Sequence, residues 1–462
     1  MDTRNLEVSE ELLDFISDSP SMFHTIRTIR RYLDQEGFTH LPESRSWNIR
    51  QGGAYYTVRN NSSLIAFKVG SNLGDGGMAA PDEDSAERFD RTVPGGFHFQ
   101  IAAAHADSPT YKVKAAPELT GPGTYVRLNV ESYGGVIDST WLDRPLSVAG
   151  RVMVRSGNRI ESRLLSIDRD ILLIPNVAIH MNHNVNKGMA YNRQVDLCPL
   201  FSAGELDAGS FDELIAEELG VKPDDILGRD LFLVNRQQPC LWGAADEFVS
   251  APKLDDLQGA FSCLKGFLAS ENDATVNVFA CFDNEEVGSG TKQGALSTFL
   301  ADTLMRTTAA LGGSREDYCR ALAKSFLVSC DNAHAVHPNH PEKTDDENRV
   351  WLNRGPVIKE AANQKYTTDA FSRAVFAEIC RRADVPFQLF ANRSDSAGGS
   401  TLGNLSNTQV SVHAVDVGMP QLAMHSAFET AGADDTAFAI RALTAFYDAD
   451  IQIEGADEAE ID

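Results

Sequence analysis

Residues 275–290, TVNVFACFDNEEVGSG, pass from an apolar run into an acidic turn. The run Thr275–Phe282 predicts a buried strand, and the acidic turn begins directly at its carboxyl end. Ligands of open α/β sheets bind beyond the carboxyl ends of the strands. This stretch therefore predicts both a core strand and one edge of a functional site, formed by Asp283, Asn284, Glu285 and Glu286.

Predicted helices and strands alternate along the chain from about residue 246. Alternating βα units imply a largely buried sheet with helices on both faces, so this part of the chain predicts an α/β fold. The pair Ser426-x-x-Glu429 indicates a capping box at the start of the last helix. The predicted helices cover 254–269, 294–311, 368–382 and 426–447, and the predicted strands cover 275–282, 325–330 and 387–391.

The N-terminal part adds elements of the same fold. Apolar residues recur at helical spacing between Pro20 and Gly37, and two short strands flank an Asn-Asn turn. A segment rich in Gly, Asp, Glu and Pro is expected to form an exposed loop. The hairpin strands are predicted at 53–58 and 64–69, the loop at 71–96 and a further strand at 97–105.

Short β-rich pieces dominate the segment 110–245. A helix at 211–219 interrupts them, with a capping box Ser210-x-x-Glu213 and a closing Gly220. The β-rich pieces are predicted at 125–130, 147–155, 159–167 and 171–181. The simplest organisation is a domain split into 1–109 and 246–448, a β-rich inserted domain at 110–245, and an acidic tail at 449–462 that frays into solvent.

The charge balance excludes some classes of partner. The 462 residues hold 41 Lys and Arg against 66 Asp and Glu, a net charge of −25. This balance argues against nucleic acid and against anionic membrane surfaces as partners. No apolar run has the length of a membrane span, and the N-terminus has no secretory pattern. Seven scattered cysteines without a CxxC pair indicate reduced thiols, so we expect a cytoplasmic protein.

Two histidines and several carboxylates are expected to gather at one edge of the sheet. Two divalent cations about 3.5–4 Å apart need a bridging carboxylate, and each also needs an imidazole and a further carboxylate. The remaining carboxylate can serve as general base. The candidate imidazoles are His105 and His425, and the candidate carboxylates are Asp255, Asp256, Glu285, Glu286 and Asp331.

Each of these motifs alone has an ordinary structural explanation. Carboxylates at a helix start complement the helix dipole, and adjacent glutamates on a turn are usually solvated. Their joint occurrence at successive strand ends favours a metal site. Three functions remain open for such a cluster: a general aminopeptidase or dipeptidase, a metal assembly without catalytic activity, and a glycosidase that uses Glu285 and Glu286. The glycosidase fits poorly, because adjacent residues rarely lie at the separation that two carboxylates need across a sugar.

Six stretches of the chain closely resemble the aspartyl aminopeptidases, a family of dinuclear zinc exopeptidases. The resemblance extends from about residue 10 to 445, and segments 139–152 and 174–186 resemble the family's inserted domain. It implies an α/β, mixed-sheet metallopeptidase domain with helices on both faces, interrupted by a β-rich inserted domain. The six stretches are HADSP (105–109), KLDDL (253–257), CFDNEEVGSGTKQGA (281–295), DNAHAVHPN (331–339), GPVIK (355–359) and LAMHS (422–426).

The resemblance also implies a role for each matching site residue. Two divalent metal ions per subunit are expected, with zinc as the expected metal. Asp255 would bridge them, His105 and Asp331 would complete one site, and Glu286 and His425 the other. Glu285 would be the base that takes a proton from the bridging water. Asp107 would fix the tautomer of His105.

The implied substrates are peptides with an N-terminal Asp or Glu. His334, Lys359 and Tyr366 resemble residues that contact substrate, and Lys359 is the cation that can pair with an acidic side chain. The family forms a homo-dodecamer, and His180 resembles a histidine that reaches a neighbouring active site. His183 lies close by in the sequence, so that position has two candidates.

Overall fold

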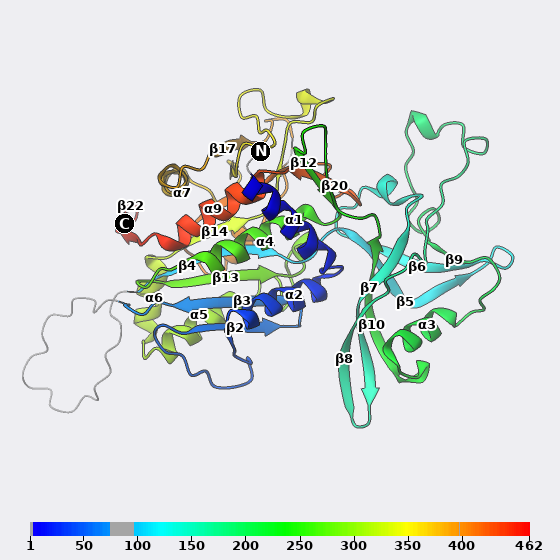
Figure 1. Ribbon diagram of the computed structural model, residues 1–462, viewed down its shortest axis with the longest axis horizontal. Helices are drawn as coiled ribbons and strands as arrows, with labels where there is room; N and C mark the ends of the chain where they lie inside the picture. Colours follow the sequence, from blue (N-terminus) through cyan, green and yellow to red (C-terminus); the bar gives the residue numbers. More distant parts are fainter. Residues whose placement is uncertain (1–2, 74–96, 397) are drawn as a thin grey trace, which may run out of the picture.

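A mixed sheet forms the centre of the computed structural model, which describes residues 3–73, 97–396 and 398–462 (Figure 1). Its described strands, in spatial order, are β1 (Thr39–His40), β2 (Ala54–Arg59), β3 (Ser63–Val69), β13 (Val276–Phe282), β4 (Phe99–His105), β14 (Phe326–Cys330), β18 (His413–Gly418), β16 (Val357–Glu360) and β17 (Gln388–Ala391). The neighbours β13, β4, β14 and β18 run parallel, whereas β2, β3 and β13 alternate in direction.

Helices cover both faces of this sheet, as the sequence predicts. Alternate residues of β4 face opposite ways, so Ala102 and Ala104 belong to one core while Phe99 and Ile101 belong to the other. The first core holds apolar residues of α1 (Thr3–Ser17), α2 (Met22–Gln35), α4 (Leu254–Ala269), α7 (Ala370–Arg382) and α9 (Asp435–Asp448). The second holds those of α5 (Phe299–Ala310), α6 (Arg315–Ala323) and α8 (Leu402–Ser406).

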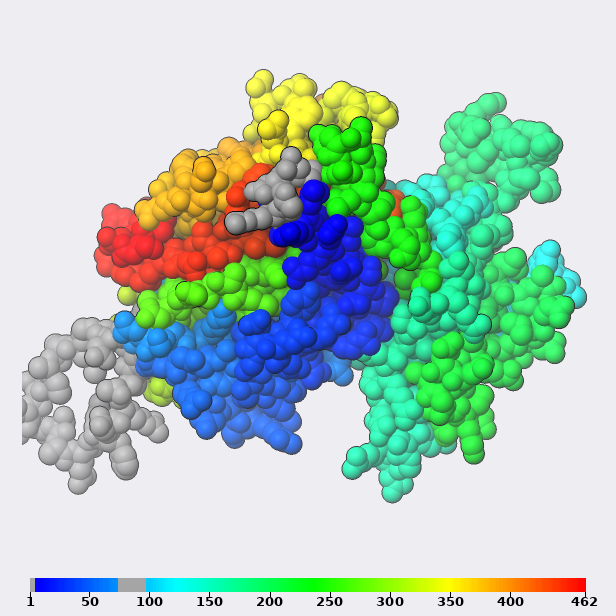
Figure 2. Space-filling model, in the orientation of Figure 1, coloured from blue at the N-terminus to red at the C-terminus, as the bar shows by residue number. Residues whose placement is uncertain are grey.

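A second, antiparallel sheet lies within residues 110–235 and has its own core. Its strands, in spatial order, are β8 (Arg159–Ser166), β7 (Leu146–Ser156), β10 (Ile226–Asn235), β5 (Thr110–Thr120), β6 (Val126–Tyr133) and β9 (Leu200–Ser202). Phe211 and Ile215 of α3 (Ser210–Leu219) pack into the same core as Val148 and Leu231. In the space-filling view, this cyan to green segment stands as a lobe beside the blue N-terminal helices (Figure 2).

A third sheet lies next to the carboxyl ends of the central strands. Its strands, in spatial order, are β11 (Cys240–Trp242), β12 (Phe248–Ala251), β20 (Glu429–Gly432), β19 (Pro420–Leu422) and β15 (Ala333–His334). Strand β12 leads into α4, and the connection between β19 and β20 contains His425. This sheet therefore supports two of the segments that the sequence assigns to the site.

Most of the sequence-predicted elements are confirmed. The hairpin at 53–69, the strands before His105 and Asp331, and the helix at 254–269 all form. Strands β5, β10, β16 and β18 and helix α6 were not predicted. The loop expected at 71–96 falls almost entirely on residues 74–96, outside the described residues. Among the described residues, no helix combines the length and apolar character that crossing a bilayer requires.

The expectation that the acidic C-terminal segment frays is wrong. It forms a hairpin of β21 (Ile451–Glu454) and β22 (Glu458–Ile461). Ile451 and Ile453 alternate with polar residues and are buried, and Gly455 supplies a positive φ in the turn. Two buried isoleucines therefore outweigh the net negative charge of this segment.

The prediction of a helix over 426–447 is wrong at its start. Residues Glu429–Gly432 form strand β20, and α9 begins only at Asp435. The Glu429 side chain does not cap a helix. It accepts hydrogen bonds from the backbone N–H groups of Asp255, in α4, and of His425, in the connection that precedes β20.

Three further local predictions are corrected. Residues 171–181 form only isolated bridges at Leu172 to Ile174, and Pro175 then removes a backbone donor. The helix predicted from 294 begins at Phe299, because Thr291 and Gln293 donate to the Asn284 side chain and hold the preceding chain in turns. Gly209, not Ser210, is the N-cap of α3, although Gly220 ends that helix as predicted.

Candidate active site

The carboxyl ends of three adjacent parallel strands meet at one edge of the central sheet. His105 is the last residue of β4, Asp331 follows β14, and Glu285 and Glu286 form a short 3-10 helix after β13. Asp255 joins them from the first turn of α4. The predicted gathering of these side chains at one sheet edge is thereby confirmed.

The two carboxylate oxygens of Asp255 face two different histidines. Oδ1 lies 3.5 Å from Nε2 of His105, and Oδ2 lies 3.4 Å from Nε2 of His425. The side chain of Asp255 is buried between the two rings. This is the arrangement that a carboxylate bridging two cations requires.

Each of the two histidines also faces one further carboxylate. Asp331 Oδ1 lies 4.0 Å from His105 Nε2, and Glu286 Oε2 lies 3.5 Å from His425 Nε2. The structure therefore contains two groups of potential ligands that share Asp255, and within each group the ligand atoms lie within 4.8 Å of one another. They are His105, Asp255 and Asp331, and Asp255, Glu286 and His425.

The chemistry of these groups fits a pair of zinc ions. Asp255 Oδ1 and Glu286 Oε1 are buried oxygens without a hydrogen-bond donor among the described residues, which is costly for carboxylates unless a cation binds them. Two ligand atoms on one tetrahedral zinc lie about 3.3 Å apart, given bond lengths of about 2.0–2.1 Å. The observed separations of 3.4 to 3.5 Å are close to that value.

Each histidine has its other ring nitrogen occupied by a carbonyl oxygen. His105 Nδ1 lies 3.1 Å from the backbone oxygen of Asp107, and His425 Nδ1 lies 2.9 Å from that of Gly135. A carbonyl can only accept, so each Nδ1 carries the proton and each Nε2 is left as a lone-pair donor facing the carboxylates.

The Asp107 carboxylate holds the acidic turn in place. Its oxygens accept the backbone N–H groups of Glu285 and Glu286, each at 3.2 Å, and the hydroxyl of Tyr133 at 2.8 Å. It is also 3.4 Å from His105 Nδ1. The Asp107 carboxylate therefore positions the two glutamates. The Asp107 carbonyl oxygen lies closer to His105 Nδ1 than the carboxylate does.

Burial and mutual repulsion shift the protonation of the carboxylates. Burial raises the pKa of Glu285 to about 8, and the nearby Asp331 and Asp107 charges add to the shift. Burial also raises the pKa of Asp331 to about 6. Burial acts in the same direction on Asp255, but the two histidines lower its pKa below the ordinary value. Two cations would favour the charged forms of all these groups.

A cavity of about 670 Å³ opens above the clustered ligands. Glu285 lies on its wall and belongs to neither Asp255-containing group, although it forms a third group of potential ligands with His105 and Glu286. Its wall also includes three of the residues predicted to bind substrate, His334, Lys359 and Tyr366.

Lys359 is buried, and its ammonium group already makes hydrogen bonds within the protein. Its Nζ donates to the backbone oxygens of Asp331 at 2.7 Å and Asn332 at 3.3 Å, and lies 5.2 Å from the centre of the Tyr366 ring. Burial lowers its pKa, but the Asp331 carboxylate and other nearby acids more than offset this and raise it above the ordinary value. Lys359 therefore stays charged, with one ammonium hydrogen still available to the cavity.

His180 does not join the site within one chain. It is exposed, in a run of turns after Ile174, and does not line the cavity. His183 is exposed in the same run. Met181 beside His180 is 77% exposed, and Ile179 is 46% exposed.

Two positions that support the site were missed from the sequence. Glu429 holds the backbone of both Asp255 and His425, and Gly135 supplies the carbonyl for His425. A Cβ atom at Gly135 would lie 3.0 Å from His425 Nδ1, so a larger residue there would crowd the imidazole ring. The Gly134-Gly135 pair was visible as a turn signal, but nothing local connected it to a histidine 290 residues away.

Comparison with known proteins agrees with this geometry. The family model "Aminopeptidase I zinc metalloprotease (M18)" matches residues 15–79 and 86–447. A probable M18 family aminopeptidase 2 of Clostridium novyi is 45% identical over 447 residues, covering 96% of this chain and 99% of the relative. The corresponding protein of Ectopseudomonas mendocina is 38% identical, covering 96% and 98%.

Solved structures share the fold over almost the whole chain. A chain of the cryo-EM structure of the Ape4 and Nbr1 complex is 32% identical, with a TM-score of 0.88, and the match covers 97% of this chain and 87% of that one. The S. cerevisiae mApe1 dodecamer is 24% identical, with a TM-score of 0.81, over 96% and 97%. The resemblance seen in the sequence motifs is confirmed, and the chain belongs to the M18 family of zinc metallo-aminopeptidases.

Proposed function

We propose that this metal-dependent aminopeptidase removes N-terminal Asp and Glu residues from peptides, with two zinc ions held by the clustered ligands. The observation that carries the proposal is the position of Asp255, whose two oxygens face His105 and His425 on opposite sides. Asp331 and Glu286 complete the two ligand sets. Bound there, the two ions would polarise the scissile carbonyl and make water acidic near neutral pH.

Glu285 is the general base in this proposal. Its carboxylate lies on the cavity wall, and its backbone N–H is fixed by Asp107. Burial keeps its proton affinity high, so it can take the proton of the attacking water and pass it to the departing amine.

Lys359 is the residue proposed to select acidic substrates. Two of its ammonium hydrogens are used by Asp331 and Asn332, and the third can meet a carboxylate in the cavity. The other charged groups on the cavity wall are carboxylates and His425, whose Nε2 would bind zinc, so Lys359 is the cation left to meet a substrate carboxylate. Tyr366 and His334 form the neighbouring walls.

An aminopeptidase with broader specificity is the second candidate. It is favoured by the fact that Lys359 is buried and already bonded to two backbone carbonyls, so that its main effect could be to hold Asp331. Hydrolysis rates on Asp-, Glu-, Leu- and Lys-nitroanilides separate the two candidates. The acidic preference predicts that Asp and Glu substrates exceed Leu by at least about tenfold in kcat/KM, and comparable rates contradict it.

Zinc dependence is tested on the same preparation. Metal analysis should give two zinc ions per chain, and a chelator should abolish hydrolysis, which added zinc restores. Hydrolysis that survives complete removal of metal would contradict the proposal. So would a stoichiometry of one ion per chain in the fully active enzyme.

We further propose that the chain forms a homo-dodecamer in which His180 enters a neighbouring active site. A dodecameric structural relative and the exposed apolar residues beside His180 support this assembly. Mixed assemblies provide a test, because the proposal predicts that His180→Ala and Glu285→Gln chains each have little activity alone. Mixing them before assembly should restore activity, since a Glu285→Gln chain can donate its His180. Failure to restore activity in verified mixed dodecamers contradicts the donation.

A division of the chain at about residues 110 and 245 and a cytoplasmic location are also proposed. The separate core of the antiparallel sheet supports the division. Seven free cysteines support a reducing compartment.

A further inference from the structure

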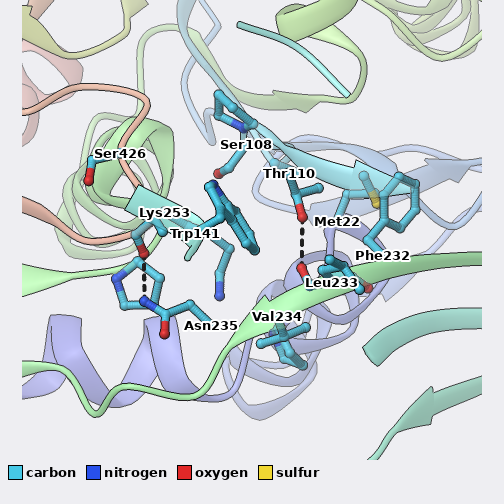
Figure 3. Close-up of a pocket in the computed structure, with 16 residues that line it drawn as sticks. Met22, Ser108, Thr110, Trp141, Phe232, Leu233, Val234, Asn235, Lys253 and Ser426 are labelled. Atoms are coloured by element: carbon cyan, nitrogen blue, oxygen red, sulfur yellow. Dashed lines mark hydrogen bonds between the residues drawn. The ribbon is translucent and has the colours of Figure 1, made fainter. Parts of the chain in front are cut away.

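A second cleft lies between α2 and the antiparallel sheet, and its lining shares no residue with the catalytic cavity. Its inner part, about 480 Å³, is lined by Trp141, Phe232 and other largely apolar residues (Figure 3). Its outer part, about 1020 Å³, includes Val148 and Ile167. Both parts share walls that include Val234 and Lys253, so they form one continuous cleft.

Two cations line this cleft without a carboxylate partner. Lys253 borders both parts, and Arg27 of α2 borders the outer part. Within residues 3–73, 97–396 and 398–462, neither side chain has an acidic group within 4.0 Å or a hydrogen-bond acceptor. In a chain of net charge −25, two unneutralised cations in one cleft are unexpected.

The acidic groups of the cleft are already neutralised. Asp18 pairs with Arg31 at 2.6 Å, and Asp168 pairs with Arg236 at 2.6 Å. Burial lowers the pKa of Lys253 to about 8, and the charge of Glu429 acts in the opposite direction, but the two Glu429 oxygens accept backbone N–H groups of the active-site segments. The positive charge of Lys253 and Arg27 therefore remains available to a ligand.

We propose that this cleft binds a small organic dicarboxylate, with one carboxylate on Lys253 and the other on Arg27. A short methylene chain between the two carboxylates would lie against Val148, Ile167 and Val234. A compact inorganic anion could pair with a cation but would leave these apolar walls uncovered. The proposal concerns a site outside the catalytic cavity and does not depend on the proposed substrate preference.

Calorimetric titration of the zinc-loaded enzyme with glutarate tests this site. The wild type should bind one glutarate per chain. Lys253→Met and Arg27→Gln should each weaken binding by at least about tenfold, because each removes one ionic partner. Lys222→Met, at an exposed lysine of the antiparallel lobe, should bind as the wild type does. Glutaramide, which has the same length without charge, should not bind.

The same titrations separate the alternatives. Glutarate that binds the catalytic zinc ions instead would bind Lys253→Met and Arg27→Gln with unchanged affinity, which overturns the proposal. Tighter binding of inorganic phosphate than of glutarate overturns the ligand class, and no binding at about 10 mM glutarate overturns the site. Lys253 is close to Asp255, so zinc content is measured in its variant. If that variant loses zinc or fails to fold, Arg27→Gln, at an exposed position of α2, decides the result.

Discussion

The carboxylate of Glu429 accepts the backbone N–H of Asp255 at 3.0 Å, although the two residues are 174 positions apart. The same carboxylate accepts the N–H of His425 at 2.6 Å. Asp255 lies in the first turn of α4 and His425 in the connection between β19 and β20, so neither directly follows a central parallel strand. One buried side chain thus fixes the relative position of two proposed ligands.

Glu429→Gln should lower zinc affinity while leaving the fold intact. The amide can replace one accepting oxygen but presents a donor to the other N–H, so one of the two hydrogen bonds is lost. Supporting residues of this kind typically change metal affinity by about 10–100-fold. Competition with a chelator measures the affinity. Thr430→Val, on the same strand, is a matched control and should retain the wild-type value.

Glu285→Gln should keep both zinc ions and lose most of the activity. The amide has the same size and cannot take a proton from water. Loss of a general base costs about 10²–10⁴-fold, and kcat should fall while KM changes little. Steady-state kinetics with metal analysis check this. A variant with near wild-type kcat would show that Glu285 is not the base.

Asp255→Ala should impair metal binding more than the loss of either His105 or His425 alone. It removes the carboxylate whose two oxygens face the two histidines and leaves the two cations unscreened. Zinc content should fall below two per chain, and the Tm should fall with it because metal binding stabilises the folded state. Full occupancy in this variant would exclude a bridging role.

The site residues that could be predicted from the sequence are those that directly follow a recognisable strand. An apolar strand followed by His105 or Asp331 can be identified without a structure, since the strand places its own carboxyl end. Glu429 could not be identified, because its partner Asp255 is 174 residues away and its Ser-x-x-Glu context imitates a helix cap. Likewise, nothing local shows that the Asp107 carboxylate holds Glu285. Tertiary hydrogen bonds, not local propensity, decide these positions.

The stability of the protein should fall between pH 7 and 5 partly through His24. Burial, with the charges of Arg27 and Lys253, lowers the pKa of His24 to about 3. The unfolded chain binds a proton at this residue below about pH 6.5, whereas the folded chain does so only near pH 3. Stability from the neutral ring is therefore present above pH 6.5 and is lost as the pH falls.

His24→Gln should reduce this acid sensitivity. The linkage contributes about 2 kcal/mol between pH 7 and 5. The variant should therefore lose less unfolding free energy than the wild type over that range in denaturant titrations. His340→Gln is the control, since His340 is exposed and its side chain is 61% accessible. Identical pH profiles for wild type and His24→Gln would contradict the shift.

Lys359→Met tests the choice of substrate directly. The substitution keeps the apolar stem and removes the ammonium, together with its hydrogen bonds to Asp331 and Asn332. Loss of one member of a desolvated charge pair costs about 2–5 kcal/mol, so kcat/KM on Asp and Glu substrates should fall by on the order of 10²-fold or more. Cleavage of a Leu substrate should fall much less, because that substrate has no carboxylate to pair.

Lys365→Met, at an exposed lysine bonded to Gly398, is the matched control and should leave both rates unchanged. Zinc content separates the two roles of Lys359: if both substrates lose activity equally and zinc is lost, Lys359 acts by holding Asp331. If both fall equally with zinc intact, the acidic preference does not come from Lys359, and His334 on the same cavity wall is the next residue to test.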